Sequence, residues 1–350
     1  MKSILFTRTN TAELVDEPIP DVTAGSVRVR LVRSCISSGT ERAILSGAPN
    51  AEVSILSDSP EVSWPRRSGY SSAGVVEAVG EGVSGIAVGD RVALSWSHHS
   101  QFVTVPAGKV HKIPDNVSFE HAALTHIATF PLVAIRKSRL ELGEPALVMG
   151  QGVLGQLAVI LLRAAGATPV IAADPDSAKR ERALALGADA ALDPTDPDFA
   201  AHVKALCPSE HKAIQGYVPM SGAAVAIEVT GVGPALDTVL DAIAPFGRVV
   251  LLGCSRKSNF SIDYYHKVHG RGVTLIGANS SARASAESSP GNWTTHDDAL
   301  AFLRLLSLRR ISLDGFVSEV HSPDECAAVY SRLATEKTFP VVQFDWTRLS

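Results

Sequence analysis

Three glycines and one aspartate have the spacing of a dinucleotide-binding site. Gly150, Gly152 and Gly155 form the pattern G-x-G-x-x-G directly after an apolar run, and Asp174 follows further along the chain. In this pattern the first glycine permits a tight turn, the second lets the backbone approach a pyrophosphate, and the third allows close strand–helix packing. The N–H groups at the helix start then bind the phosphates. The cofactor-binding residues expected are Gly150, Gly152, Val153, Leu154, Gly155, Asp174, Thr230 and Gly253.

Asp174 indicates which dinucleotide is bound. An acidic side chain at the end of the second strand accepts hydrogen bonds from the adenosine ribose hydroxyls and repels a 2′-phosphate, so it favours NAD over NADP. Asp176 adds negative charge, whereas Arg180 and Arg182 would weaken the preference if they turned inward. The alternative role of Asp174 is that of an acidic residue at a helix N-terminus.

The elements around these residues alternate between strand and helix, which is typical of a mostly parallel sheet covered on both faces. The strands predicted there cover 146–149, 169–173, 223–229, 248–252 and 273–276, and the helices cover 154–165, 177–186 and 235–243. Before residue 120, short strands separated by Gly and Pro predict a β-rich domain. Those strands cover 27–32, 74–80, 89–94, 101–105 and 110–113. One long helix is expected over 120–139, helices over 297–308 and 324–334, and a last strand over 341–344.

The bulk properties describe a two-domain globular protein. The chain has 350 residues, 45% of them hydrophobic and 19% charged, with a net charge of −4. A mildly acidic chain without a basic block makes nucleic acid an improbable partner. No apolar run is long enough to span a membrane, and the N-terminus lacks a signal-peptide core. Four scattered cysteines without a CxxC pair fit a reduced protein, so we expect a cytoplasmic location.

The order and spacing of several motifs resemble those of the medium-chain dehydrogenase/reductase superfamily, whose members include the alcohol dehydrogenases. These motifs lie at 39–41, 69–76, 88–92, 150–155, 187–189 and 228–231. The resemblance implies an α/β fold with a β-rich GroES-like catalytic domain (1–122), a doubly wound Rossmann NAD-binding domain (123–278) and a return to the catalytic domain (279–350). It places the active site in the cleft between the domains. Runs at 38–41, 99–107 and 122–129 resemble the subgroup that contains bacteriochlorophyllide dehydrogenases.

The positions that bind zinc in this superfamily carry other residues here. Ser38 stands where zinc members have a cysteine, and Tyr70 stands where they have a histidine. The third ligand position falls near Thr125 or His126, and the four-cysteine loop of the structural zinc is absent. Hydroxyl groups are poor zinc ligands. We therefore expect no catalytic metal.

A rearranged metal site is the alternative. It would use the side chains of Cys35, His99 and His126. Cys35 packing as a small buried hydrophobe is the competing interpretation.

Without a metal, hydrogen-bond donors must polarise the substrate oxygen. Tyr70 is the first candidate, Thr40 matches the hydroxyl that relays a proton in the family, and Ser38 supplies a second donor. His126 and His99 are candidate bases, because imidazole titrates near neutral pH. The catalytic residues expected are Tyr70, Thr40, Ser38 and His126.

Several of the polar residues also have a structural interpretation. Tyr70 would only fill the space left by the metal, and His99 would cap a strand or bind a backbone carbonyl. Glu41 would orient arginines such as Arg42. The run Tyr264, Tyr265, His266 and His269 would line either the substrate side of the cleft or a subunit contact.

The function expected is NAD-dependent interconversion of a secondary alcohol and a ketone, without zinc, on a polyol, cyclitol, sugar or secondary metabolite. One alternative is zinc-independent reduction of an activated double bond, as in quinone and enoyl reductases; another is a non-catalytic NAD-binding protein. Resemblance to the family also implies a homodimer, in which strand 273–276 pairs with its copy at the sheet edge.

Overall fold

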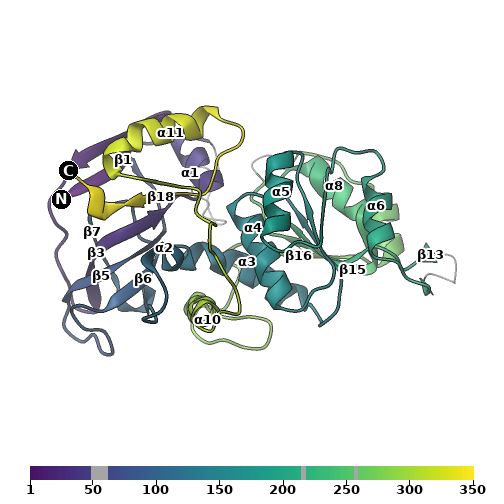
Figure 1. The fold of residues 1–350 in the computed structure, drawn as a ribbon, viewed down its shortest axis with the longest axis horizontal. Coiled ribbons are helices and arrows are strands. Elements are labelled where there is room, and N and C mark those ends of the chain that lie inside the picture. The colour runs from purple at the N-terminus through teal and green to yellow at the C-terminus, as the bar shows by residue number, and fades with distance from the viewer. Residues whose placement is uncertain (49–61, 214–217, 256–258) are drawn as a thin grey trace. The chain divides into compact units, whose positions relative to one another are not determined.

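The computed structural model describes residues 1–48, 62–213, 218–255 and 259–350, which form two compact units (Figure 1). Unit 1 comprises Met1–Ala128 and Ala299–Ser350, and unit 2 comprises Thr129–Asp298. No helix in the described part of the chain is long and apolar enough to cross a membrane.

Unit 1 is built around the long strand β3 (Ser26–Cys35), which pairs antiparallel with β5 (Ser71–Val79), β7 (Phe102–Pro106) and β18 (Val342–Asp345). The sheet order is β17-β18-β3-β5-β6-β8, and it is completed by β6 (Arg91–Ser95), β8 (Val110–Lys112) and β17 (Glu319–His321). The last strand of the chain thus contributes to the sheet of the N-terminal segment.

A second, three-stranded sheet of unit 1 has the order β2-β1-β4. Its strands are β1 (Lys2–Arg8), β2 (Thr11–Asp16) and β4 (Arg66–Arg67), and the helices nearby are α1 (Ser38–Leu45) and α11 (Cys326–Thr335). Both sheets and α11 share one apolar core, in which Phe6 packs edge-on against Tyr330 with 4.8 Å between ring centroids. This core fixes α1 and α11, which carry residues of the candidate site.

Unit 2 contains a six-stranded parallel sheet of order β11-β10-β9-β14-β15-β16. The strands are β9 (Ala146–Met149), β10 (Val170–Ala173), β11 (Ala190–Leu192), β14 (Ala223–Glu228), β15 (Ile243–Leu251) and β16 (Thr274–Gly277). The order reverses between β9 and β14, because the chain fills one half of the sheet and then returns to build the other. A reversal of this kind is the topological switch point where ligands bind in open α/β sheets.

Helices lie on both sides of this sheet (Figure 1). Leu147 and Met149 of β9 face the core formed with α6 (Phe199–Leu206) and α8 (Gly233–Ala242). Because side chains alternate along a strand, Val148 faces the opposite side. Further helices of this unit include α4 (Val153–Ala164), α5 (Ser177–Ala185) and α9 (Tyr264–Lys267), and it also has a short strand pair, β12 (Lys212–Ala213) and β13 (Val218–Pro219). The Rossmann fold expected from the sequence is therefore confirmed.

The single long helix predicted over 120–139 is wrong. The structure has α2 (Phe119–Ala122) and α3 (Thr125–Ser138). At the break the Ser71 hydroxyl donates to the Ala123 carbonyl at 2.6 Å and accepts from the Ile127 N–H at 3.3 Å. The buried Ser71 side chain therefore satisfies the Ala123 carbonyl and the Ile127 N–H, which would pair with other backbone groups in a continuous helix. Later in the chain α10 (Thr295–Ser307) confirms the helix predicted over 297–308.

Candidate active site

The glycine loop connects β9 to α4 and leaves no space for side chains at two of its three positions. Gly150 has φ +98°, and a Cβ there would lie 2.7 Å from Cγ2 of Thr230. A Cβ on Gly155 would lie 1.8 Å from the carbonyl oxygen of Gly150. A Cβ on Gly152, in contrast, meets nothing within 4 Å. The first and third glycines are required by the fold, so the second is the one left open for a ligand.

The helix that follows begins without a side-chain cap. Gly152 is the N-cap of α4, and no side chain accepts a hydrogen bond from the first turn there. The first turn also contains no acidic residue, and Val153 is buried. Uncapped N–H groups and the positive end of the helix dipole favour an anion such as a pyrophosphate.

Asp174 lies directly after β10 and is buried beside the glycine loop. Its carboxylate accepts hydrogen bonds from the Gln151 N–H at 2.8 Å and the Asp176 N–H at 3.0 Å. The Lys179 ammonium lies 3.7 Å from it. A carboxylate has about four acceptor positions, so Asp174 retains capacity for ribose hydroxyls.

The two arginines near Asp174 bind elsewhere. Arg180 donates to the Asp174 and Pro175 carbonyls and pairs with Asp193 at 3.2 Å, and Arg182 donates to Gln156. Neither forms an ion pair with the Asp174 carboxylate in the described residues. Neither the Arg180 nor the Arg182 side chain therefore has the inward orientation that would weaken the preference for NAD.

A third loop, after β14, meets the glycine loop. The Glu228 carboxylate accepts hydrogen bonds from the backbone N–H groups of Thr230 at 2.7 Å and Gly231 at 3.1 Å. Burial raises the pKa of Glu228, although these bonds act in the opposite direction. A Cβ on Gly253 would lie 2.3 Å from the Gly231 nitrogen. The loops after β14 and β15 therefore pack backbone against backbone, and the Thr230 methyl group packs against Gly150 of the loop after β9.

In unit 1, Tyr70 and the start of α1 bring three hydroxyl groups together. The Tyr70 phenol donates a hydrogen bond to the Ser37 hydroxyl, and its side chain also bonds to Thr40. Burial raises the pKa of Tyr70 well above its ordinary value, while these two bonds oppose the rise. Tyr70 is therefore a neutral hydrogen-bond donor at physiological pH. Ser38 is the first residue of α1 and is half-buried.

Aromatic rings surround the Tyr70 side chain. The His126 ring lies edge-on to it with 5.5 Å between centroids, and the Trp96 ring lies 5.8 Å away. Trp96 and His126 are also in edge contact, at 4.8 Å. Trp96 is 48% exposed and has φ +60°, a backbone conformation that few residues other than glycine adopt. Sequence reasoning missed Trp96, because a positive φ at a non-glycine residue has no sequence signature.

Glu41 and His99 are fully buried and bind each other, which corrects two predictions. Glu41 was expected to orient Arg42, but Arg42 donates to the Glu336 carbonyl instead. His99 was expected to cap a strand or bind a backbone carbonyl, but its ring nitrogens lie 2.8 Å from the Ser34 hydroxyl and 3.1 Å from the Glu41 carboxylate. Each prediction assigned an ordinary local role to a residue that binds partners distant in sequence.

The residues at the zinc-ligand positions do not fit a zinc ion. Ser38 and Tyr70 offer hydroxyl groups, the third position offers Thr125 or His126, and the Tyr70 hydroxyl is engaged with Ser37. Within the described ranges, no three His, Cys, Asp or Glu side chains are grouped so as to hold a metal. Cys35 is buried, and its Sγ lies 3.8 Å from the Ile36 carbonyl oxygen and 3.7 Å from that of Val342, which fits a small buried side chain.

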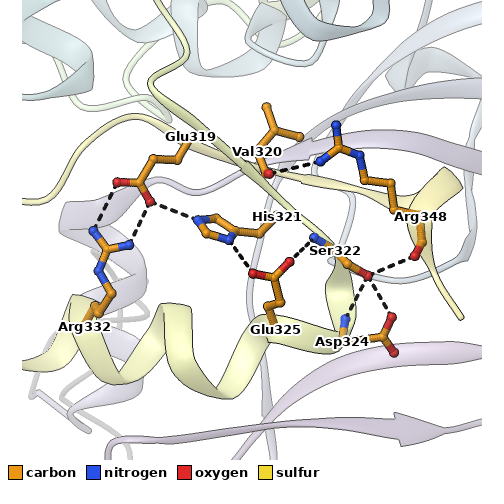
Figure 2. Close-up of polar contacts among 8 residues, drawn as sticks. All are labelled: Glu319, Val320, His321, Ser322, Asp324, Glu325, Arg332 and Arg348. Carbon is orange, nitrogen blue, oxygen red and sulfur yellow. Dashed lines mark hydrogen bonds and ion pairs between the residues drawn. The ribbon is translucent and has the colours of Figure 1, made fainter.

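A second cluster of titratable groups joins β17 to α11 and the C-terminus (Figure 2). His321 bonds to Glu319 at 2.9 Å and to Glu325 at 2.8 Å, and Arg332 holds Glu319 with two nitrogens. Arg348 donates to the Val320 carbonyl. These side chains are partly exposed and fasten the C-terminal segment, so we assign them a structural role.

The strand order, the glycine loop and Asp174 define an oxidoreductase-type Rossmann domain for a nicotinamide dinucleotide. Two family models match the chain: the alcohol dehydrogenase GroES-like domain over residues 24–115 and the zinc-binding dehydrogenase over residues 153–290. The chain belongs to the medium-chain, zinc-type alcohol dehydrogenase superfamily and is an NAD-dependent dehydrogenase.

Relatives of known activity support this membership. A 2-dehydro-3-deoxy-L-galactonate 5-dehydrogenase of Pseudoalteromonas atlantica is 30% identical over 260 residues, which are 65% of this chain and 69% of the relative. An L-threonine 3-dehydrogenase of Pyrococcus furiosus is 28% identical over 295 residues, 76% and 79% of the two chains. The crystal structure of galactitol-1-phosphate dehydrogenase from Escherichia coli has TM-score 0.81 and 19% identity, and covers 99% of this chain and 100% of that one.

Proposed function

We propose that the protein interconverts a secondary alcohol and a ketone on a polyol, cyclitol, sugar or related secondary metabolite, with NAD and without catalytic zinc. The observation that carries this proposal is the neutral phenol of Tyr70, which donates a hydrogen bond to Ser37. Tyr70 stands at a position where zinc members of the superfamily have a metal ligand. The named substrates of the two curated relatives carry several oxygen functions, as does galactitol phosphate.

The proposed reaction assigns a role to each of the following residues. Bound NAD supplies the hydride acceptor. Gly152 and the start of α4 hold its pyrophosphate, and Asp174 accepts from its ribose. Tyr70 donates a hydrogen bond to the substrate oxygen, which carries negative charge in the transition state. Since a hydroxyl both donates and accepts, Ser37 then donates to Tyr70 in place of accepting from it.

Four further side chains are assigned to the same site. Thr40 relays the alcohol proton from Tyr70 to the base, and Ser38 offers a second donor at the start of α1. His126 is the candidate base next to the Tyr70 ring. Trp96 covers the ring of Tyr70 and contributes an exposed apolar surface for the carbon skeleton of the substrate.

The test follows reduced-nicotinamide absorbance with NAD and pools of polyols, cyclitols, sugars and simple secondary alcohols. The proposal expects an increase with one pool, retained after exhaustive chelation and in protein containing less than about one zinc per ten chains. Activity that disappears on chelation and returns with zinc would overturn zinc independence. No turnover with any pool, together with NADPH-dependent reduction of a quinone or enone, would favour a double-bond reductase.

A homodimer is part of the proposal. Strand β16 is the edge of the six-stranded sheet, and three of its four residues are exposed, among them Leu275. An exposed edge strand pairs readily with a second copy across a two-fold axis. Sedimentation analysis of the wild type and of Leu275→Lys tests this: we expect a dimer that the charged variant weakens.

A further inference from the structure

Ser37 occupies a capping position but does not use its hydroxyl to cap. It is the N-cap of α1, where a serine side chain normally accepts an N–H of the first turn. Here no side-chain cap bond forms, and the hydroxyl accepts from Tyr70 instead. The Ser37 backbone N–H donates to Oε1 of Glu41 at 2.8 Å. Glu41 thus holds the helix start while the Ser37 hydroxyl is left to Tyr70.

Several donors converge on the Glu41 carboxylate. Besides the Ser37 N–H, the Tyr330 phenol donates to its Oε2 at 2.5 Å, and Nε2 of His99 lies 3.1 Å from the same oxygen. Glu41, His99 and Tyr330 are all completely inaccessible to solvent. A buried carboxylate is costly unless it is hydrogen-bonded on every side, so the position of Glu41 is strongly determined by these donors.

His99 contacts both the Ser34 hydroxyl and the turn that carries Tyr70. Its Nδ1 lies 2.8 Å from the Ser34 hydroxyl, which accepts from the Trp346 indole N–H at 2.9 Å. In one consistent arrangement Ser34 donates its hydroxyl hydrogen to Nδ1 and the Nε2–H of His99 donates to Glu41. Each hydrogen atom then forms one hydrogen bond. The ring of His99 also lies against Gly69, where a Cβ would be 2.7 Å from Cδ2. Gly69, with φ +89°, directly precedes Tyr70.

We propose that Glu41 and His99 are positioning residues for the Tyr70–Ser37 pair, a role that rests on the proposed function. Glu41 fixes Ser37 through the backbone at the start of α1, and the His99 ring shapes the turn that carries Tyr70. Neither residue touches substrate in this proposal. Their effect is to hold two hydroxyl groups in the geometry that one hydrogen bond to a substrate oxygen requires.

The experiment compares two buried histidines. His111, like His99, is buried and bonds to a serine hydroxyl, in this case Ser95 at 2.9 Å. His99→Gln and His111→Gln are each made in the wild type and in Tyr70→Phe. We expect His99→Gln to lower kcat about 10-fold or more with KM for NAD unchanged, and less than about 2-fold in the Tyr70→Phe background. His111→Gln should leave kcat unchanged in both backgrounds.

Two outcomes would overturn the proposal. One is an unchanged kcat per folded molecule in His99→Gln, and the other is an equal loss in both backgrounds, as a merely structural role would give. If His99→Gln does not fold, Tyr330→Phe is used in the same comparison, because it removes one donor from Glu41. If the wild type turns over no alcohol, the proposed function fails, and positioning is then judged from melting temperatures. Coupling predicts that Glu41→Gln and Tyr70→Phe shift the melting temperature non-additively, whereas additive shifts refute it.

Discussion

Tyr70 donates its phenolic hydrogen to the hydroxyl of Ser37, the N-cap residue of α1, which lies 33 positions earlier in the chain. The two side chains are buried, and the bond joins the turn before β5 to the start of a helix. Tyr70 stands at a position where zinc members of the superfamily have a metal ligand, and Ser37 is next to another such position. Removing this hydrogen bond therefore tests the proposed chemistry most directly.

Tyr70→Phe should lower kcat by about 100-fold or more, because the phenylalanine ring keeps the packing against Trp96 and His126 but provides no donor. KM for NAD should not change. Ser37→Ala should give a smaller loss, since Thr40 still bonds Tyr70. The matched control is Ser97→Ala, which removes another buried serine bonded to a hydroxyl, that of Ser72. Equal kcat in Tyr70→Phe and wild type would remove tyrosine from the mechanism.

The raised pKa of Tyr70 predicts how kcat for ketone reduction by the wild type depends on pH. Burial raises the pKa of Tyr70 above the ordinary 10.0, so the phenol stays protonated and remains a donor up to that pH. Ketone reduction should therefore show no loss from tyrosine ionisation between about pH 7 and 10. A decline centred near pH 8 in kcat that disappears in Tyr70→Phe would show that the phenol is acidified, and would contradict this account.

The glycine loop offers a comparison between two alanine substitutions. Gly155→Ala places a Cβ 1.8 Å from the Gly150 carbonyl oxygen, so the strand and helix must separate and thermal stability should fall sharply. Gly152→Ala meets nothing within 4 Å and has an ordinary φ of −75°, so the unliganded protein should melt close to the wild type. Its KM for NAD should rise about 10-fold or more, because the methyl group occupies the approach of the pyrophosphate. Melting curves with and without NAD separate these effects.

The sequence was sufficient to predict the Rossmann fold, while the cofactor-binding residues stay a prediction. The spacing of Gly150, Gly152, Gly155 and Asp174 depends on local backbone geometry, and the strand and helix periods around them are strong. The elements β9, α4, β10 and α5 accordingly begin and end within a residue or two of their predicted limits.

The hydroxyl cluster of unit 1 was predictable only in part. Tyr70 and Thr40 were identified because they stand at or beside family motif positions. Ser37, Tyr330 and Trp346 were not, since their contacts join residues separated by up to about 300 positions, which periodicity and motifs do not report. Helix α1 was also missed, because it begins with Ser-Gly-Thr and is stabilised by Glu41 and the packing of unit 1 more than by local propensity.

Replacing Asp174 should change the choice of cofactor. Asp174→Ser removes the charge that repels a 2′-phosphate, and Lys179, 3.7 Å from the carboxylate, is then unpaired and attracts one. We expect KM for NAD to rise about 10-fold and the ratio of kcat/KM for NADP to that for NAD to increase. Asp193→Asn is the control, because Asp193 pairs with Arg180 after the next strand and is not assigned to the ribose. An unchanged ratio would refute the role of Asp174.

The cluster in Figure 2 predicts how stability depends on pH. The hydrogen bond from Arg332 is the main reason that the pKa of Glu319 falls from 4.5 to about 2, so its stabilisation is complete above pH 4.5 and is lost as the pH falls toward 2. For His321, partial burial lowers the pKa, but the bonds to Glu319 and Glu325 outweigh it and raise the pKa above 6.5. Its stabilisation is therefore complete below pH 6.5 and is lost as the pH rises through the raised value.

Melting curves of the wild type and His321→Gln at closely spaced pH values measure this contribution. The melting temperature of His321→Gln should lie below that of the wild type at pH 5.5, and the difference should shrink as the pH rises above 6.5. Glu325→Gln should reduce the same difference, because it removes one of the two carboxylates that hold the imidazolium. A difference that is constant between pH 5.5 and 9 would show that His321 contributes through packing and not through its charge.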